Sequence, residues 1–130
     1  METVEIIIDK LSYEIIRTVE GKLNITLKID GKPFNEYFKI SNVGFCLSPD
    51  ELINSLNNSG RFFIFTCDCG DAGCAGWFRG ILVDKKGDSY TWQIDEKIPV
   101  STKLVFSRKQ YTDLIDNLFN DLKKMTKDGV

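Results

Sequence analysis

The residues best suited to chemistry are three cysteines that lie within eight positions of one another. Cys67, Cys69 and Cys74 form a C-x-C-x4-C pattern, and Cys46 is the fourth cysteine of the 130-residue chain. Thiolates are good zinc ligands, and residues two apart at the end of a strand share one face, so these three could bind zinc with Cys46 as a distant fourth ligand. Because the chain contains no histidine, such a site would be all-thiolate or would include a carboxylate.

Two other interpretations of this cysteine-rich segment stay open. A reactive or redox-active thiol is disfavoured because Asp68 and Asp71 lie beside the cysteines, and no histidine or neighbouring lysine could stabilise a thiolate. A structural role is consistent with Gly70, Gly73 and Gly76, which allow a tight reversal of the chain in which small thiols fill narrow space. The spacing departs from the paired cysteines of common zinc sites, which favours the structural role.

The absence of histidine also limits the enzymes that this chain could be. Catalytic triads built on imidazole, HExxH metalloproteases and haem sites with a histidine ligand all require that residue. The adjacent carboxylates of Asp95 and Glu96 would point to opposite faces of a strand, which makes them a poor acid–base pair. We therefore expect a protein that is not an enzyme and has no cofactor, unless the cysteines bind zinc.

The distribution of charge indicates which partners to expect. The chain has 17 basic and 19 acidic residues and a pI of about 5.2, without the basic excess of nucleic-acid-binding proteins. Residues 48–100 are the most acidic part, with eight acidic and five basic residues. Their acidic side chains near turns and strand ends could form a contact surface for a basic partner protein, or could simply keep the protein soluble. The candidate contact residues are Asp68, Asp71, Asp84, Asp88, Asp95 and Glu96.

The amino-terminal residues and the overall composition favour a cytoplasmic protein. Met-Glu-Thr-Val-Glu has no basic region, and no long apolar stretch follows, so we expect neither a signal peptide nor a membrane span. Cysteines in the cytoplasm usually remain reduced. With 42% hydrophobic and 28% charged residues and no linker or repeat, we expect a single domain over residues 1–130.

Alternating apolar and polar residues predict the strands that position the cysteine-rich segment. Glu20-Gly21 and Asp30-Gly31 are suited to tight hairpin turns. Residues 61–67 are short, apolar and aromatic, which predicts a central strand buried on both faces. The predicted strands are residues 4–8, 13–19, 23–29, 34–40, 61–67, 77–83, 90–94 and 103–106.

Two capping-box patterns predict helices. Ser48 and Glu51 flank Pro49 at the start of the first helix, and Ser107 and Gln110 begin the second. The second carries an apolar stripe formed by Tyr111, Leu114, Ile115, Leu118, Leu122 and Met125. The pattern predicts an α+β fold with a mostly antiparallel sheet or sheets of about seven or eight strands and two helices, the second at the C-terminus.

Side-chain type and spacing also predict which residues are buried. Aromatic residues at strand periodicity usually belong to the core, and the residues concerned are Phe62, Phe63, Phe65, Trp77, Phe78 and Trp92. Asp113, Asp116 and Asp121 are expected on the solvated face of the last helix.

The segment FTCDCGDAGCAGW, followed by FRGILV and then YTWQI, resembles a group of small bacterial proteins with an F-T-C-x-C-G-x-x-G-C-x-G segment. That match spans residues 65–94 and implies no activity. The small, acidic α+β profile is similar to that of immunity proteins of contact-dependent growth inhibition and other polymorphic toxin systems. This resemblance implies direct binding and neutralisation of a cognate toxin. Our leading hypothesis is therefore an immunity protein, and the alternative is a zinc-binding structural or regulatory module.

Overall fold

Two β-sheets and three helices make up the part of the chain that the computed structural model describes, residues 3–40, 45–66 and 76–128. Sheet A has the strand order β1 (Val4–Ile7), β10 (Thr102–Ser107), β9 (Ser89–Ile94), β8 (Ile81–Lys86) and β6 (Gly60–Phe62). Sheet B has the order β2 (Leu11–Arg17), β3 (Leu23–Ile29), β5 (Cys46–Leu47) and β7 (Phe65–Thr66), with β4 (Lys32–Pro33) also paired with β3. The helices are α1 (Phe34–Tyr37), α2 (Pro49–Asn57) and α3 (Arg108–Asp128).

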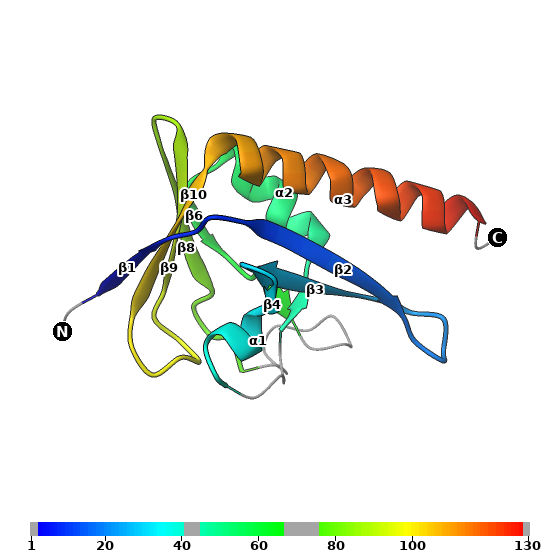
Figure 1. Ribbon diagram of the computed structural model, residues 1–130, viewed down its shortest axis with the longest axis horizontal. Coiled ribbons are helices and arrows are strands. Elements are labelled where there is room, and N and C mark those ends of the chain that lie inside the picture. Colours follow the sequence, from blue (N-terminus) through cyan, green and yellow to red (C-terminus); the bar gives the residue numbers. More distant parts are fainter. Residues whose placement is uncertain (1–2, 41–44, 67–75, 129–130) are drawn as a thin grey trace.

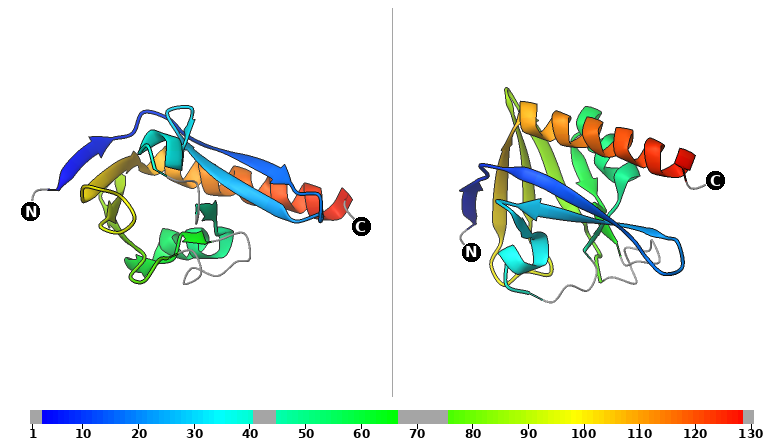
Figure 2. Two further views of the ribbon diagram at one scale, coloured as in Figure 1. Left: turned by 90° about the horizontal axis from the view of Figure 1, so that it is seen from below. Right: turned by 45° about the vertical axis from the view of Figure 1, so that its right-hand side comes forward.

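The predicted α+β class is confirmed, although the element count differs. The described residues form ten strands in place of the predicted seven or eight, and three helices in place of two, the last at the C-terminus. Strand β1 is parallel to β10, and the other described pairs are antiparallel. Figure 1 shows sheet A nearly edge-on, and α3 follows β10 and runs over β2. Figure 2 shows the same arrangement from two other sides. Helix α3 therefore covers both sheets, because it contacts β2, β9 and β10 as well as α2.

The prediction of a strand over residues 34–40 was wrong. Residues Phe34–Tyr37 form helix α1, directly after Pro33, whose φ of −52° already suits a helical turn. Phe34 and Phe38 are four positions apart, the spacing of neighbours on a helix, and their ring centroids lie 4.8 Å apart. The apolar run in this segment therefore follows a helical period and not the period of a strand.

The single central strand predicted for residues 61–67 was also wrong. Its first part is β6, at the edge of sheet A, and its second part is β7, at the edge of sheet B. Between them, the Phe63 amide donates to Glu51 Oε1 at 3.1 Å, and the Ser48 amide donates to the carbonyl of Ile64 at 2.7 Å. The start of α2 thus takes over backbone hydrogen bonds that a sheet neighbour would otherwise make, and the chain crosses from one sheet to the other.

The C-terminal helix begins as predicted, but its first turn also has a tertiary role. The Gln110 amide donates to Ser107 Oγ at 3.2 Å, which is one half of the capping box. The Gln110 side chain reaches the segment between β1 and the start of β2, where Nε2 donates to the carbonyl of Ile8 at 3.0 Å and Oε1 accepts from the amide of Leu11 at 3.1 Å. Gln110 therefore joins α3 to the link between the two sheets.

The side of α3 that faces β2 corrects one surface prediction. Asp121 accepts a hydrogen bond from the Tyr13 hydroxyl and is only partly exposed, whereas Asp113 and Asp116 are exposed as predicted. Burial and the nearby Asp121 carboxylate raise the pKa of Tyr13 above its ordinary value. The Tyr13–Asp121 contact therefore attaches the second half of α3 to β2.

A buried hydrogen-bonded cluster connects α2, α3 and sheet A. The Tyr111 hydroxyl lies 2.6 Å from Ser55 Oγ and accepts from Trp92 Nε1 at 3.2 Å. Ser55 Oγ also lies 2.6 Å from the Leu52 carbonyl. Because a hydroxyl has one proton, Ser55 donates to that carbonyl and Tyr111 donates to Ser55. Each polar group in this cluster has a partner, as a buried polar group requires.

A cluster of aromatic side chains forms one part of the core. Phe34, Phe45, Phe65 and Trp77 stack or pack edge to face with centroid distances of 4.6 to 5.9 Å, and Trp92 continues this cluster toward α3. In the described part of the chain, we find no helix that is both long enough and apolar enough to cross a membrane.

Candidate functional site

An exposed aromatic side chain marks the strongest candidate site. Strand β8 begins at Ile81, so residues Trp77 to Gly80 form a turn in place of the predicted start of a strand; we name these four residues the aromatic turn. Trp77 is buried, but Phe78 is 79% exposed. Of the six aromatic residues predicted in the core, Phe65, Trp77 and Trp92 are buried and Phe62 and Phe63 partly buried, so Phe78 is the clear exception.

A single carboxylate fixes the backbone of the aromatic turn. Glu96 Oε1 accepts from the amides of Phe78 and Arg79, both at 3.1 Å, and Oε2 accepts from the amides of Arg79 and Gly80 at 3.0 and 2.8 Å. Hydrogen bonds between amides and an ionised carboxylate are stronger than those between neutral groups. The exposed Phe78 side chain is thus carried on a backbone that is held at three consecutive amides.

Positive backbone φ angles gather around this turn. Gly80 has φ +77°, and a Cβ atom there would lie 2.6 Å from the carbonyl oxygen of Phe62, so no larger residue fits without movement. Lys97, next to the carboxylate that holds the turn, has φ +68°, and Gly76 has φ +90°. Glycine adopts positive φ without strain, whereas Lys97 does so only where surrounding contacts enforce it.

Two arginines share the second carboxylate of this site. Asp95 Oδ2 lies 3.2 Å from Nη2 of Arg79 and 3.7 Å from Nη2 of Arg61, and Arg79 Nη2 also donates to the Asp95 carbonyl at 3.3 Å. The side chain of Asp95 is 22% exposed, whereas those of Arg61 and Arg79 are 41% and 55% exposed. Asp95 Oδ1 is buried and has no hydrogen-bond partner among the described residues. The Asp95 carboxylate is therefore largely shielded from solvent, whereas the two guanidinium groups are partly exposed to solvent.

Lys97 connects the aromatic turn to the core below it. Its ammonium lies 5.1 Å from the ring centroid of Phe45 and 5.7 Å from that of Trp77, within the range of cation–π contacts. Burial lowers the pKa of Lys97, and the charge of Glu96 opposes that effect. Lys97, the residue after Glu96, is therefore packed against the aromatic rings of Phe45 and Trp77.

The predicted zinc ligands are only partly within the described residues. Cys67, Cys69 and Cys74 lie outside them, and so do the predicted contact residues Asp68 and Asp71. Cys46 lies in β5, where it pairs with Thr66 of β7. The described residues contain no cluster of three or more side chains that could hold a metal ion.

The other predicted contact residues do not come together. Asp84 accepts from Ser59 Oγ at 3.2 Å and from the amide of Lys85 at 2.9 Å, and Asp88 is exposed at the β8–β9 turn. Asp95 and Glu96 follow the other end of β9, roughly 20 Å from Asp88 at the rise of an extended strand. The described acidic residues thus form two separate groups, and those at the aromatic turn are engaged by arginines and backbone amides.

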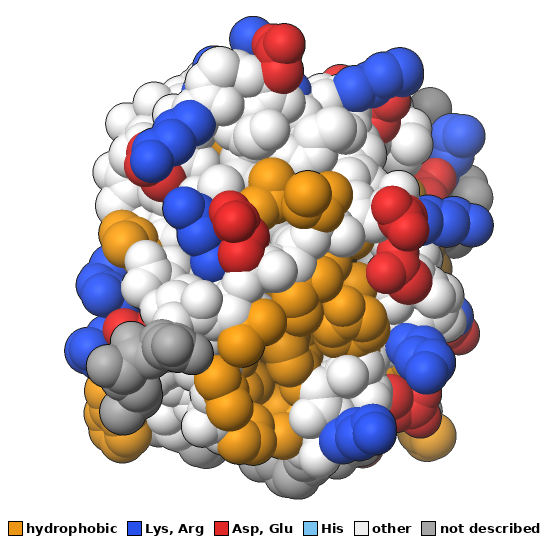
Figure 3. Space-filling model, turned by 60° about the vertical axis from the view of Figure 1, so that its left-hand side comes forward, with side chains coloured by type: hydrophobic (Ala, Val, Ile, Leu, Met, Phe, Trp, Pro, Cys, Tyr) orange, Lys and Arg blue, Asp and Glu red, His pale blue; other side chains and the backbone are white. Residues whose placement is uncertain are grey.

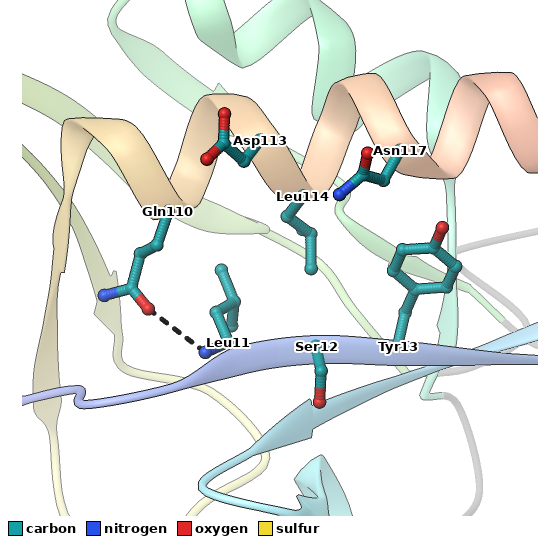
Figure 4. Close-up of a pocket in the computed structure, with 7 residues that line it drawn as sticks. All are labelled: Leu11, Ser12, Tyr13, Gln110, Asp113, Leu114 and Asn117. Carbon is teal, nitrogen blue, oxygen red and sulfur yellow. Dashed lines mark hydrogen bonds between the residues drawn. The ribbon is translucent and has the colours of Figure 1, made fainter.

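A groove between β2 and α3 is a second candidate (Figure 4). Its volume is about 270 Å³, with Leu11 and Leu114 on opposite walls and Gln110 bonded across it. Most polar groups at this groove already have partners. Gln110 bonds to the β1–β2 link, Asp113 pairs with Lys109, and Tyr13 bonds to Asp121. The hydrogen bonds around the groove therefore attach α3 to β2, and they occupy most of the polar groups that a ligand would need.

A hydrophobic area on the side of the molecule that carries β1 is a third candidate (Figure 3). Strand β1 lies at the edge of sheet A, and its Val4 and Ile7 side chains are exposed. Glu5 lies between them. Such an edge offers backbone groups for pairing, but its side chains specify no particular ligand.

The sequence predicted Asp95 and Glu96 of this site as contact residues. It did not predict that role for Phe78, Arg61 or Arg79. The available signal was Gly76, which precedes the aromatic turn, and Gly80, its last residue, because two glycines in this short segment argue against a strand. Comparison of the chain with protein-family models, with curated proteins and with solved structures gave no match. The geometry of the aromatic turn therefore provides the basis for a functional proposal.

Proposed function

We propose that this chain is a protein-binding module, and that it acts as an immunity protein that neutralises a cognate toxin by direct contact. The observation that carries the proposal is the exposure of Phe78 on a turn whose backbone is fixed by Glu96. The small acidic α+β profile, with net charge −2, supports the more specific assignment to immunity proteins.

A fixed backbone that carries an exposed aromatic side chain favours the use of that side chain as an anchor. Aromatic residues dominate the energetics of protein interfaces, particularly when they enter a pocket of the partner. Binding is weakened by the entropy lost when a flexible segment becomes ordered. Because Glu96 already accepts from the amides of Phe78, Arg79 and Gly80, little backbone ordering remains to be done on binding.

The proposal can be tested with the product of the reading frame adjacent to this gene, because immunity genes are expected beside their toxin genes. Purified chain and that product should bind tightly in isothermal titration calorimetry, and co-expression should rescue growth if the product is toxic. Phe78→Ala should weaken binding by about 100-fold, the effect of losing an interface anchor, and should abolish the rescue.

Val19→Ala is the matched control, because Val19 is a fully exposed apolar residue on the β2–β3 turn. This variant should bind like wild type. Equal binding by wild type and Phe78→Ala would overturn the role of the aromatic turn. An adjacent product that is neither toxic nor bound would overturn the immunity assignment.

A zinc-binding structural or regulatory module is the second candidate. The observation that favours it is the pairing of Cys46 with Thr66, the residue that directly precedes Cys67 in the chain. Elemental analysis of the purified protein should then give one zinc per chain, which Cys46→Ser and Cys67→Ser should each reduce together with the melting temperature. Protein without zinc, or with zinc that survives both substitutions, would overturn this candidate.

A further inference from the structure

The surface around the aromatic turn exposes guanidinium donors of Arg61 and Arg79 to solvent more than carboxylate acceptors. A guanidinium has five N–H donors, and within the described residues the hydrogen bond and ion pairs of the Arg61 and Arg79 guanidinium groups all go to Asp95. Both arginine side chains are about half exposed. Most of their donors are therefore available to a binding partner.

The two carboxylates of the site are less available than the arginines. Both oxygens of Glu96 accept from backbone amides of the aromatic turn. Asp95 Oδ2 lies between the two guanidinium groups, and Oδ1 is buried. Around the aromatic turn, guanidinium N–H groups are therefore more available to a partner than carboxylate oxygens.

We infer that Phe78, Arg61 and Arg79 together bind an acidic, apolar segment of the partner protein. Phe78 enters an apolar pocket, and the arginines bind Asp or Glu carboxylates at its rim, for which the planar guanidinium is well suited. This inference rests on the proposed function and specifies its partner chemistry. It differs from the basic partner that the charge of residues 48–100 predicts, because the acidic residues at this turn are used within the molecule.

A display library of random linear peptides, selected on the immobilised full chain, tests this chemistry even before the partner is identified. The enriched peptides should combine Asp or Glu with large apolar residues. Fluorescence anisotropy should then give binding about tenfold weaker for Arg61→Gln/Arg79→Gln, and increasing salt should weaken wild-type binding, as expected for desolvated charge pairs and their screening.

Asp95→Asn distinguishes binding of an acidic peptide by Arg61 and Arg79 from a purely structural role of these two arginines. Removing the competing carboxylate should strengthen peptide binding about threefold, opposite in sign to the arginine variant. Lys123→Gln/Lys124→Gln removes the same charge from the exposed face of α3 and should leave binding unchanged. Melting curves establish whether each variant folds. If the double arginine variant fails to fold, the sign of the Asp95→Asn effect decides.

Enrichment of basic or uncharged peptides, or of none, would overturn the inference. Weaker binding by folded Asp95→Asn would also overturn it, because that result indicates a structural role. If the adjacent gene product requires Phe78 but tolerates Arg61→Gln/Arg79→Gln, the inference fails and the proposed function stands. If Phe78→Ala affects neither the adjacent product nor the peptides, both fail.

Discussion

The buried cluster around Tyr111 and the aromatic turn both depend on polar groups that bridge separate elements, yet they hold side chains in opposite environments. Tyr111, Ser55 and Trp92 are all buried, and their hydrogen bonds lock α2 and α3 onto sheet A. At the aromatic turn, Glu96 holds a backbone that exposes Phe78. The first arrangement contributes to stability through buried hydrogen bonds, whereas the second fixes the backbone that carries an exposed apolar side chain.

The largest expected effect lies on the buried side of this comparison. Trp92→Ala should lower the free energy of unfolding by about 3–5 kcal/mol, because it removes a fully buried aromatic ring and leaves a cavity. Urea denaturation monitored by circular dichroism measures this. A loss below about 1 kcal/mol would mean that the core around Trp92 repacks, which would weaken the contrast between the two regions.

Glu96→Gln should reduce the free energy of unfolding by about 2 kcal/mol, because the charged acceptor of three backbone amides is replaced by a neutral amide with a single carbonyl oxygen. Hydrogen exchange should accelerate mainly at the amides of Phe78, Arg79 and Gly80. Glu20→Gln, an exposed substitution of the same kind on the β2–β3 turn, should change neither quantity. Uniform exchange across the molecule would instead indicate that the turn is part of the core's cooperative unit.

Tyr111→Phe should cost about 1 kcal/mol at neutral pH, since Ser55 and Trp92 lose a buried partner. Burial raises the pKa of Tyr111 from 10.0 to about 12. The folded state therefore holds this proton more tightly than the unfolded chain, and the corresponding stability is present below pH 10 and is lost as pH rises to 12. The stability difference between wild type and variant should narrow over that interval in urea titrations, and a constant difference would contradict the assignment.

The smallest expected effect on stability belongs to Phe78→Ala, which should change the free energy of unfolding by no more than about 0.5 kcal/mol because the side chain is 79% exposed. Paired with Trp92→Ala, it gives two aromatic deletions with opposite consequences, one for folding and one for binding. A loss above about 2 kcal/mol would assign Phe78 to the core and remove the basis for an interface anchor.

Local sequence patterns predicted where elements begin more reliably than what their side chains contact. Ser48 and Ser107 correctly marked the starts of α2 and α3. However, Ser48 makes no side-chain cap, and Glu51 accepts from the amide of Phe63 instead. Gln110 likewise bonds to Ile8 and Leu11. Capping residues are read from a window of four positions, whereas these partners are set by the tertiary fold.

The candidate site was partly accessible from sequence for the same reason. Asp95 and Glu96 were identified as charged residues at a strand end. The amides that Glu96 binds, however, lie 16 to 18 positions away in the chain. One partner of Asp95 is Arg61, which belongs to another strand. The Glu96 contacts fix the backbone that carries the exposed Phe78 side chain. Hydrophobicity therefore predicted burial for a residue that the fold holds in solvent.

The parallel pairing of β1 with β10 has a consequence for how the chain folds. It joins Val4 to Thr102 and Ile7 to Val105, contacts of very long sequence separation, which slow folding because a large loop must close first. The β2–β3 and β8–β9 hairpins need only short turns and can form while synthesis continues, whereas sheet A is complete only after β10 has left the ribosome. During that interval the apolar side chains of β1 and the unpaired edge of β9 are exposed to aggregation, so a nascent chain of this protein is expected to benefit from a chaperone until α3 docks.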